Sequence, residues 1–214
     1  MSKIDFKKCD KALYSGRAGR FDILEVPPLP YLMIDGKGDP NSCVAFGKSI
    51  AALYSLSYTL KFHSKLELGK DYVVPPLEGL WWAEDMGAFT AGEKDQWQWT
   101  LMIRQPDWIQ VDTVEQARDK AAQKIEKKKD AGTDLETIQK IEFSKLEEGT
   151  CVQVLHIGPY DDEGQILEVL HNEFIPQNNY RMVGKHHEIY LNDPRKTAPE
   201  KLKTLLRQPI RKIS

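Results

Sequence analysis

Residues 100–106 read TLMIRQP, and residues 204–209 repeat most of these letters as TLLRQP. Each stretch closes the same order of expected elements, namely a strand, a helix and two further strands. A short match at the same place in two equal orders indicates an internal duplication. The expected elements fall at 21–40, 41–63, 71–84 and 97–106 in the first half, and at 149–160, 162–174, 180–191 and 202–213 in the second.

The duplication predicts an α+β fold made of two strand-helix-strand-strand units with pseudo-two-fold symmetry. We expect antiparallel sheets with the helices on one side and a ligand cleft between the units, because small molecules bind in crevices at such junctions. The chain is interpreted as a single domain, residues 1–214, with repeat one at about 21–106, a helical connector at about 107–142 and repeat two at about 143–212.

The composition excludes several classes of protein. The chain has 214 residues, and its 30 Lys and Arg against 32 Asp and Glu give a net charge of -2, without the basic excess of a nucleic-acid binder. Cys9, Cys43 and Cys151 have no metal-binding spacing and are typical of free thiols. No apolar run is long enough for a signal peptide or a membrane span. We therefore expect a soluble, cytoplasmic protein with no membrane and no direct nucleic-acid partner.

The connector is highly charged and carries a thin apolar stripe of Val114, Ala117, Ala121 and Ile125. This pattern is typical of two surface helices around a turn, with the lysines forming a solvated face. A membrane-surface or nucleic-acid role would need a larger basic excess than the neighbouring acidic residues leave.

The stretch GKHHEIYLNDP at 184–194 places His186, Glu188 and Tyr190 at every second position of an expected strand. Alternate side chains share one face, so these three point one way while Ile189 points the other. If the apolar face packs on the helix of its own repeat, Glu188 turns into the cleft. There it could act as a general base or hold a cationic ligand. The alternative is an exposed glutamate on an edge strand.

The first repeat carries the letters LEGLWW at the equivalent place. An alignment without gaps pairs Trp81 with Tyr190. An alignment of the two glutamates instead pairs Glu78 with Glu188. A shift of one residue exchanges the two faces of a strand, so either Trp81 or Trp82 faces the cleft, depending on the alignment. A flat aromatic surface in the cleft would suit a planar ligand.

Tyr160 follows a Gly-Pro turn where a strand enters its helix, a position that can place its side chain over the mouth of the cleft. A metal site is not expected. His186 and His187 point to opposite faces of a strand and cannot share an ion, while His186 and Glu188 lack an evident third ligand. We also expect no cofactor.

Three longer runs carry a family resemblance: HIGPYDDEGQILEVL at 156–170, HHEIYLNDPRKTAPEKLKTLLRQPI at 186–210 and YVVPPLEGLWWAEDM at 72–86. They resemble the GyrI-like small-molecule-binding domain family in its stand-alone, cyclopropanoid cyclopropyl hydrolase-like form, over nearly all of 20–212. The resemblance implies two such units side by side and a ligand cleft with aromatic walls. It also implies a central glutamate, which maps onto Glu188.

The resemblance implies several activities. Relatives include a gyrase-inhibitory protein, effector domains of multidrug-responsive regulators, and hydrolases that open the cyclopropyl ring of DNA-alkylating cyclopropanoid compounds. The first 20 residues are too short for the DNA-binding helices of the regulators. The favoured hypothesis is a hydrolase in which Glu188 is the catalytic residue. Its expected substrate-binding residues are Trp81, Trp82, Tyr160, Tyr190, Glu78 and His186. The alternatives are a non-catalytic binder of aromatic or cationic drugs and a gyrase-interacting protein.

Overall fold

The computed structural model describes residues 3–84, 94–127 and 132–213. The first repeat follows α1 (Phe6–Cys9) and β1 (Asp22–Val26) and consists of β2 (Leu29–Lys37), α2 (Val44–Glu67), β3 (Glu78–Trp82), a 3₁₀ turn (Lys94–Gln96) and β4 (Gln98–Arg104). The connector holds α4 (Val111–Lys127), α5 (Leu135–Gln139) and β5 (Glu142–Leu146).

The second repeat begins with β6 (Gly149–Ile157) and a 3₁₀ turn (Tyr160–Asp162). Next come α6 (Glu163–Val169), a π-helical turn (Leu170–Phe174) and α7 (Ile175–Gln177). The repeat ends with β7 (Tyr180–Met182), β8 (His186–Tyr190), a 3₁₀ turn (Pro199–Lys201) and β9 (Lys203–Lys212).

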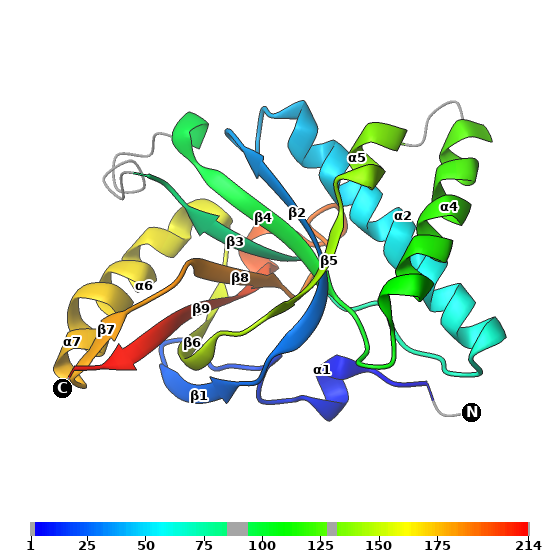
Figure 1. Ribbon diagram of the computed structural model, residues 1–214. Helices are drawn as coiled ribbons and strands as arrows, with labels where there is room; N and C mark the ends of the chain where they lie inside the picture. Colours follow the sequence, from blue (N-terminus) through cyan, green and yellow to red (C-terminus); the bar gives the residue numbers. More distant parts are fainter. Residues whose placement is uncertain (1–2, 85–93, 128–131, 214) are drawn as a thin grey trace.

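Nine strands of the described residues form one antiparallel sheet with the order β1-β6-β9-β8-β3-β4-β2-β5, and β7 pairs with β9 (Figure 1). Around the centre the order β6-β9-β8 of the second repeat mirrors the order β2-β4-β3 of the first. The two repeats therefore meet at the pair of β3 and β8, where the pseudo-two-fold axis passes. The predicted fold class is confirmed, with the two units sharing a single sheet.

The outer strands are exchanged between the repeats. β1 precedes the first repeat in sequence but pairs with β6 of the second, with Val26 opposite Gly149. β5 precedes the second repeat but pairs with β2 of the first, with Leu29 opposite Leu146. The two chain segments therefore form one long ribbon. It bends where the pairing is interrupted, at Pro27 and Pro28 of one segment and at Glu147 and Glu148 of the other. This ribbon links the two ends of the sheet, and the sheet curls strongly into a half-barrel (Figure 1).

Both repeat helices cover the same face of this curled sheet. Helix α2 buries Leu53 and Leu56 against Trp99 and Leu101 of β4, and the apolar stripe of α4 joins this core. The second repeat has a smaller core, formed by Val152 and Ile210 of the sheet with Leu170 and Ile175 of the helical segment. The other face, inside the curl, holds a separate core that includes Leu80, Met102, Ile189 and Leu205.

The structure differs from expectation in its strand boundaries. The expected strand at 180–191 is divided into β7 and β8 at Gly184, whose φ of 65° favours glycine. The segment 142–146, for which no strand was expected, pairs with β2. Among the helices in the described ranges, none is long and apolar enough to cross a membrane.

Candidate functional site

The candidate site lies where the two repeats meet, on the helix-bearing face of β3 and β8. Gly79 stands opposite Glu188, and Trp81 stands opposite His186. Directly opposed residues point to the same face of a sheet, so Trp81 shares a face with Glu188 and its neighbour Tyr190. This placement decides the register in favour of the alignment without gaps.

A chain of hydrogen bonds orients the Glu188 carboxylate. The indole Nε1–H of Trp81 donates to the hydroxyl oxygen of Tyr190 at 3.0 Å, and that hydroxyl donates to Oε2 of Glu188 at 2.8 Å. Burial, and next the adjacent Glu188, raise the pKa of Tyr190 well above its ordinary value, so its proton stays in place. The Glu188 side chain is 15% exposed, and its Oε1 lies 3.5 Å from Nε2 of His186. Within the part of the chain that the structure describes, no group donates a hydrogen bond to Oε1, so this oxygen can accept a proton or contact a cation.

Aromatic rings surround this carboxylate. Tyr160 packs its edge against Tyr190 at 5.6 Å between ring centroids, and Trp81 contacts Trp97 and Phe46 at 6.0 and 5.9 Å. Tyr160 is the most exposed of these rings, at 39%. Burial, and next the carboxylates of Glu163 and Glu188, raise its pKa to about 12. Aromatic faces beside a carboxylate favour planar or cationic ligands.

Gly79 makes room for this arrangement. A Cβ atom at this position would lie 2.9 Å from Nε1 of Trp81 and 3.2 Å from the hydroxyl oxygen of Tyr190. Both distances are shorter than ordinary contacts, so the hydrogen bond between these side chains requires a residue without a side chain at position 79.

Two further titratable groups, which the sequence did not single out, interact with Glu188 or with its neighbour His186. Glu163 is buried, with 5% of its surface exposed. Burial, and next the charge of Glu188, raise the pKa of Glu163 to about 9. The nearby Thr204 hydroxyl lowers this pKa by a smaller amount. The imidazole of His171 lies 6.3 Å from that of His186 between centroids. Burial, and next His186, lower the pKa of His171 to about 4, so it is neutral at neutral pH.

The structure brings together Glu188, Tyr190, Trp81, His186 and Tyr160. It places Glu78 and Trp82, which were also expected beside Glu188, on the opposite face, because they alternate with Gly79 and Trp81 along β3.

The structure also reverses the expected faces of β8. We expected its apolar face, with Ile189, to pack on the helix of the second repeat. The face that bears Glu188 is the one that the helices cover, while Ile189 packs inside the curl.

On that inner face Glu78 belongs to a buried ionic network. His187 Nε2 lies 3.0 Å from Oε2 of Glu78, and its Nδ1 lies 2.9 Å from Oε1 of Glu148. Arg207 contacts the second oxygen of Glu148 at 3.2 Å. Burial alone would lower the pKa of His187, but the two carboxylates more than offset this and raise it. Hydroxyls of Tyr14 and Tyr31 also donate to Glu78, each at 3.1 Å.

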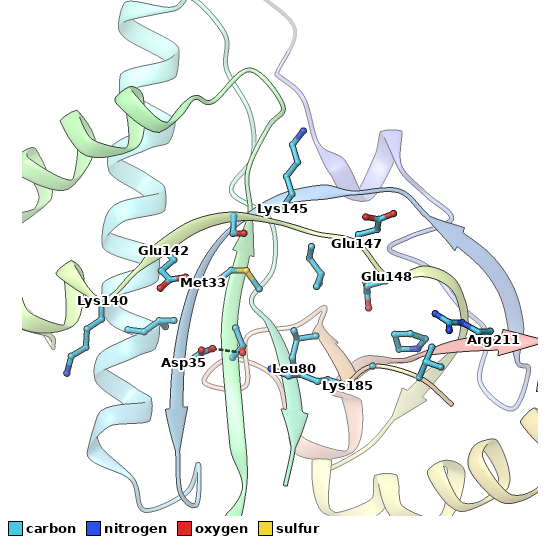
Figure 2. A pocket seen from close by; sticks show the side chains of 17 residues that line it. Met33, Asp35, Leu80, Lys140, Glu142, Lys145, Glu147, Glu148, Lys185 and Arg211 are labelled. Carbon is cyan, nitrogen blue, oxygen red and sulfur yellow. Dashed lines mark hydrogen bonds between the residues drawn. The ribbon is translucent and has the colours of Figure 1, made fainter. Parts of the chain in front are cut away.

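A pocket of about 740 Å³ opens inside the curl. Figure 2 shows its lining, with Leu80 and Glu148 toward its centre and charged side chains such as Lys145, Glu147 and Arg211 around them. Lys185 also lines it, with its ammonium 3.1 Å from the centroid of the Trp82 ring. Glu188 and Tyr190 are not among the lining residues, so this pocket is separate from the candidate site.

Within the ranges that the structure describes, no three His, Cys, Asp or Glu side chains are grouped so as to hold a metal ion.

The comparisons with known proteins point to one family. A family model described as GyrI-like small molecule binding domain matches residues 20–211. An uncharacterized conserved protein from Listeria innocua is 39% identical, over 98% of this chain and 100% of that one, with a TM-score of 0.86. A hydrolase encoded by lin2189 from the same organism is 38% identical over the same shares, with a TM-score of 0.84. No curated protein matches the chain.

A more distant likeness concerns the fold alone. The C-terminal domain of EcmrR is 13% identical over 91% of this chain and 98% of that one, with a TM-score of 0.56.

Proposed function

The chain belongs to the GyrI-like small-molecule-binding domain family, and from that membership we propose that it is a hydrolase that opens the cyclopropyl ring of DNA-alkylating cyclopropanoid compounds. The observation that carries the proposal is the Glu188 carboxylate, partly buried among aromatic rings and fixed by the Tyr190 hydroxyl at 2.8 Å. Similar proteins of Listeria innocua that bear the name hydrolase add support for a catalytic role.

In the proposed reaction Glu188 acts as a general base through Oε1. It removes a proton from a water molecule whose oxygen attacks a ring carbon, and one carbon–carbon bond of the ring breaks. Tyr190 and Trp81 are positioning residues for the carboxylate. Tyr160 and Trp81 supply aromatic surface for a planar ligand. The strained ring provides much of the driving force, so orientation and base catalysis suffice without a cofactor.

The direct test replaces Glu188 by Gln, which keeps the shape of the side chain and removes the base. We expect the rate of ring opening, measured by chromatography of the products, to fall by about 10²- to 10⁴-fold. Binding, measured by quenching of tryptophan fluorescence, should change little, because the aromatic surface is intact. Glu200→Gln is the matched control, since Glu200 is exposed and is not one of the residues of the candidate site. Undiminished turnover in Glu188→Gln would exclude the role of this base.

A second candidate function is the sequestration of cationic or aromatic drugs without conversion. It is favoured by the same partly exposed carboxylate among aromatic rings, which suits a cation as well as a water molecule. Under this function the ligand is recovered chemically unchanged after incubation with excess protein, and Glu188→Gln weakens the binding of cations more than that of neutral aromatics.

A further inference from the structure

Glu163 is a buried carboxyl group that the proposed reaction has not yet used. It is the first residue of α6 and is 5% exposed. The Thr204 hydroxyl lies close enough to this carboxyl group to lower its pKa slightly, but neither Oε1 of Glu163 nor that hydroxyl makes a well-formed hydrogen bond with any residue that the structure describes. Thr204 stands opposite Tyr190 in the sheet, so the neighbouring carboxyl of Glu163 lies on the Tyr190 side of the candidate site.

Glu163 and Glu188 are coupled through their charges. The charge of Glu188 raises the pKa of Glu163, and Glu163 in turn adds to the raised pKa of Tyr190 and of Tyr160. Two carboxyl groups that share a buried site do not both ionise, and the more buried one keeps its proton. Because Glu163 has a pKa of about 9, it is a neutral acid at neutral pH and holds a transferable proton.

The other acidic protons of the site are less suitable for transfer. The hydroxyl proton of Tyr190 is engaged with Oε2 of Glu188. Tyr160, with a pKa of about 12, is a weaker acid than Glu163, and His171, with a pKa of about 4, carries no extra proton at neutral pH.

Resting on the proposed function, we propose that Glu163 is the proton donor of the site. In the proposed reaction this proton goes to the carbonyl oxygen that is conjugated with the cyclopropyl ring of the bound compound.

The balance of the reaction explains why an acceptor oxygen is needed. As the water oxygen bonds to the ring carbon, the electron pair of the breaking carbon–carbon bond must move elsewhere in the substrate. A conjugated carbonyl receives it on oxygen, and the proton of Glu163 converts that oxygen to a hydroxyl group. Glu188 takes the proton of the attacking water. One proton passed from Glu188 to Glu163 through solvent restores the site, and the net change is the addition of one water.

The test uses the full chain and a spirocyclopropyl cyclohexadienone as the probe substrate. Glu163→Gln keeps the size of the side chain but cannot transfer a proton, so kcat should fall by about 10²- to 10⁴-fold, with KM changed by less than about threefold. The kcat of the unmodified protein should decline above about pH 9, as Glu163 ionises, and this decline should be absent from the residual activity of the variant. Glu168→Gln, an exposed change on the same helix, should leave both kcat and the pH profile unaltered.

A second measurement is independent of turnover. Infrared spectroscopy of the unmodified protein at neutral pH should show the carbonyl band of a protonated carboxyl group that is missing in Glu163→Gln and present in Glu168→Gln. The band should shift when an unreactive cyclohexadienone without the cyclopropyl ring is added, because Glu163 donates to its oxygen.

The outcomes separate the two proposals. Ring opening with unchanged kcat in Glu163→Gln overturns the role of Glu163 and leaves Glu188 as the base. If the unmodified protein does not open the ring, the hydrolase proposal fails, and the infrared band decides the role of Glu163. A band that shifts with the dienone supports the donor, and a band that is absent or does not shift overturns it.

Discussion

Replacing Glu148 by Gln should destabilise the folded protein, because this carboxylate neutralises two buried cations. Its side chain is 3% exposed and contacts His187 at 2.9 Å and Arg207 at 3.2 Å. The variant keeps the size of the side chain but leaves both cations with one negative partner fewer. The network lies directly behind the candidate site, since His187 adjoins Glu188 on β8.

The size of the effect follows from the pKa of Glu148. Burial alone would raise it, but His187 and then Arg207 more than offset this and lower it from 4.5 to about 2. This difference corresponds to about 3 kcal/mol of stability at neutral pH. Breaking one partner of a buried ion pair costs a similar amount, about 3 to 5 kcal/mol. For a chain of this length the melting temperature should fall by about 10 °C.

The assay is urea unfolding at several pH values, with Glu147→Gln as the matched control. Glu147 is the exposed neighbour of Glu148 and undergoes the same change in charge. Because the pKa of Glu148 is lowered by folding, its contribution is complete above its ordinary pKa of 4.5 and is lost as the pH falls toward 2. The stability difference between the unmodified protein and Glu148→Gln should therefore narrow on acidification. A loss below about 1 kcal/mol at neutral pH, or a difference that does not depend on pH, would refute this reasoning.

Two glycine substitutions test the packing around the site. Gly79→Ala should push Trp81 and Tyr190 apart and lower ligand affinity, measured by tryptophan fluorescence, by about 10- to 100-fold. The control is Gly47→Ala on helix α2, where a Cβ meets nothing within 4 Å, and it should leave the affinity unchanged. Gly36→Ala should destabilise the fold by about 3 kcal/mol in urea unfolding, because its Cβ would lie 2.0 Å from the fully buried Trp99 ring. Normal affinity in the first variant, or normal stability in the last, would show that these rings adjust more freely than their packing implies.

The order of the elements was predictable from sequence because it depends on local patterns. The alternation of His186, Glu188 and Tyr190 predicted that they share a face, and they do. The exchange of β1 and β5 was not predictable, because it joins segments more than a hundred residues apart and no local pattern encodes such a pairing.

The letters that indicated the duplication do not align in the structure, where the shared TL is displaced by one residue and the shared RQP by two. Leu101 lies opposite Gly79 in the first repeat, and Leu206 lies opposite Glu188 in the second. Leu101 therefore corresponds to Leu206, whereas the letter match aligns it with Leu205. The duplication is present, but its register follows the pairing of the strands and not the shared letters. The same limit explains why Glu78 was expected at the site, since a shift by one residue exchanges the faces.

The raised pKa of Glu163 and the lowered pKa of His171 depend on burial by the helical segment of the second repeat. Glu163 stands in the run GPYDDEGQ, next to two other acidic residues, and nothing in that run distinguishes the acid that becomes buried. Only the packing of α6 against the sheet separates Glu163, at 5% exposure, from the exposed Asp161 and Asp162.

The pair of Gly79 and Glu188 lies on the axis that relates the repeats, and this position has a consequence for how such a site can arise. In a symmetric dimer of half-length chains, the two residues that face each other across the axis must be identical. Two glycines would supply no acid, and two glutamates would repel each other and fill the space that Trp81 and Tyr190 now occupy. Fusion of the halves into one polypeptide removes this constraint, so that one half can provide the empty space and the other the carboxylate.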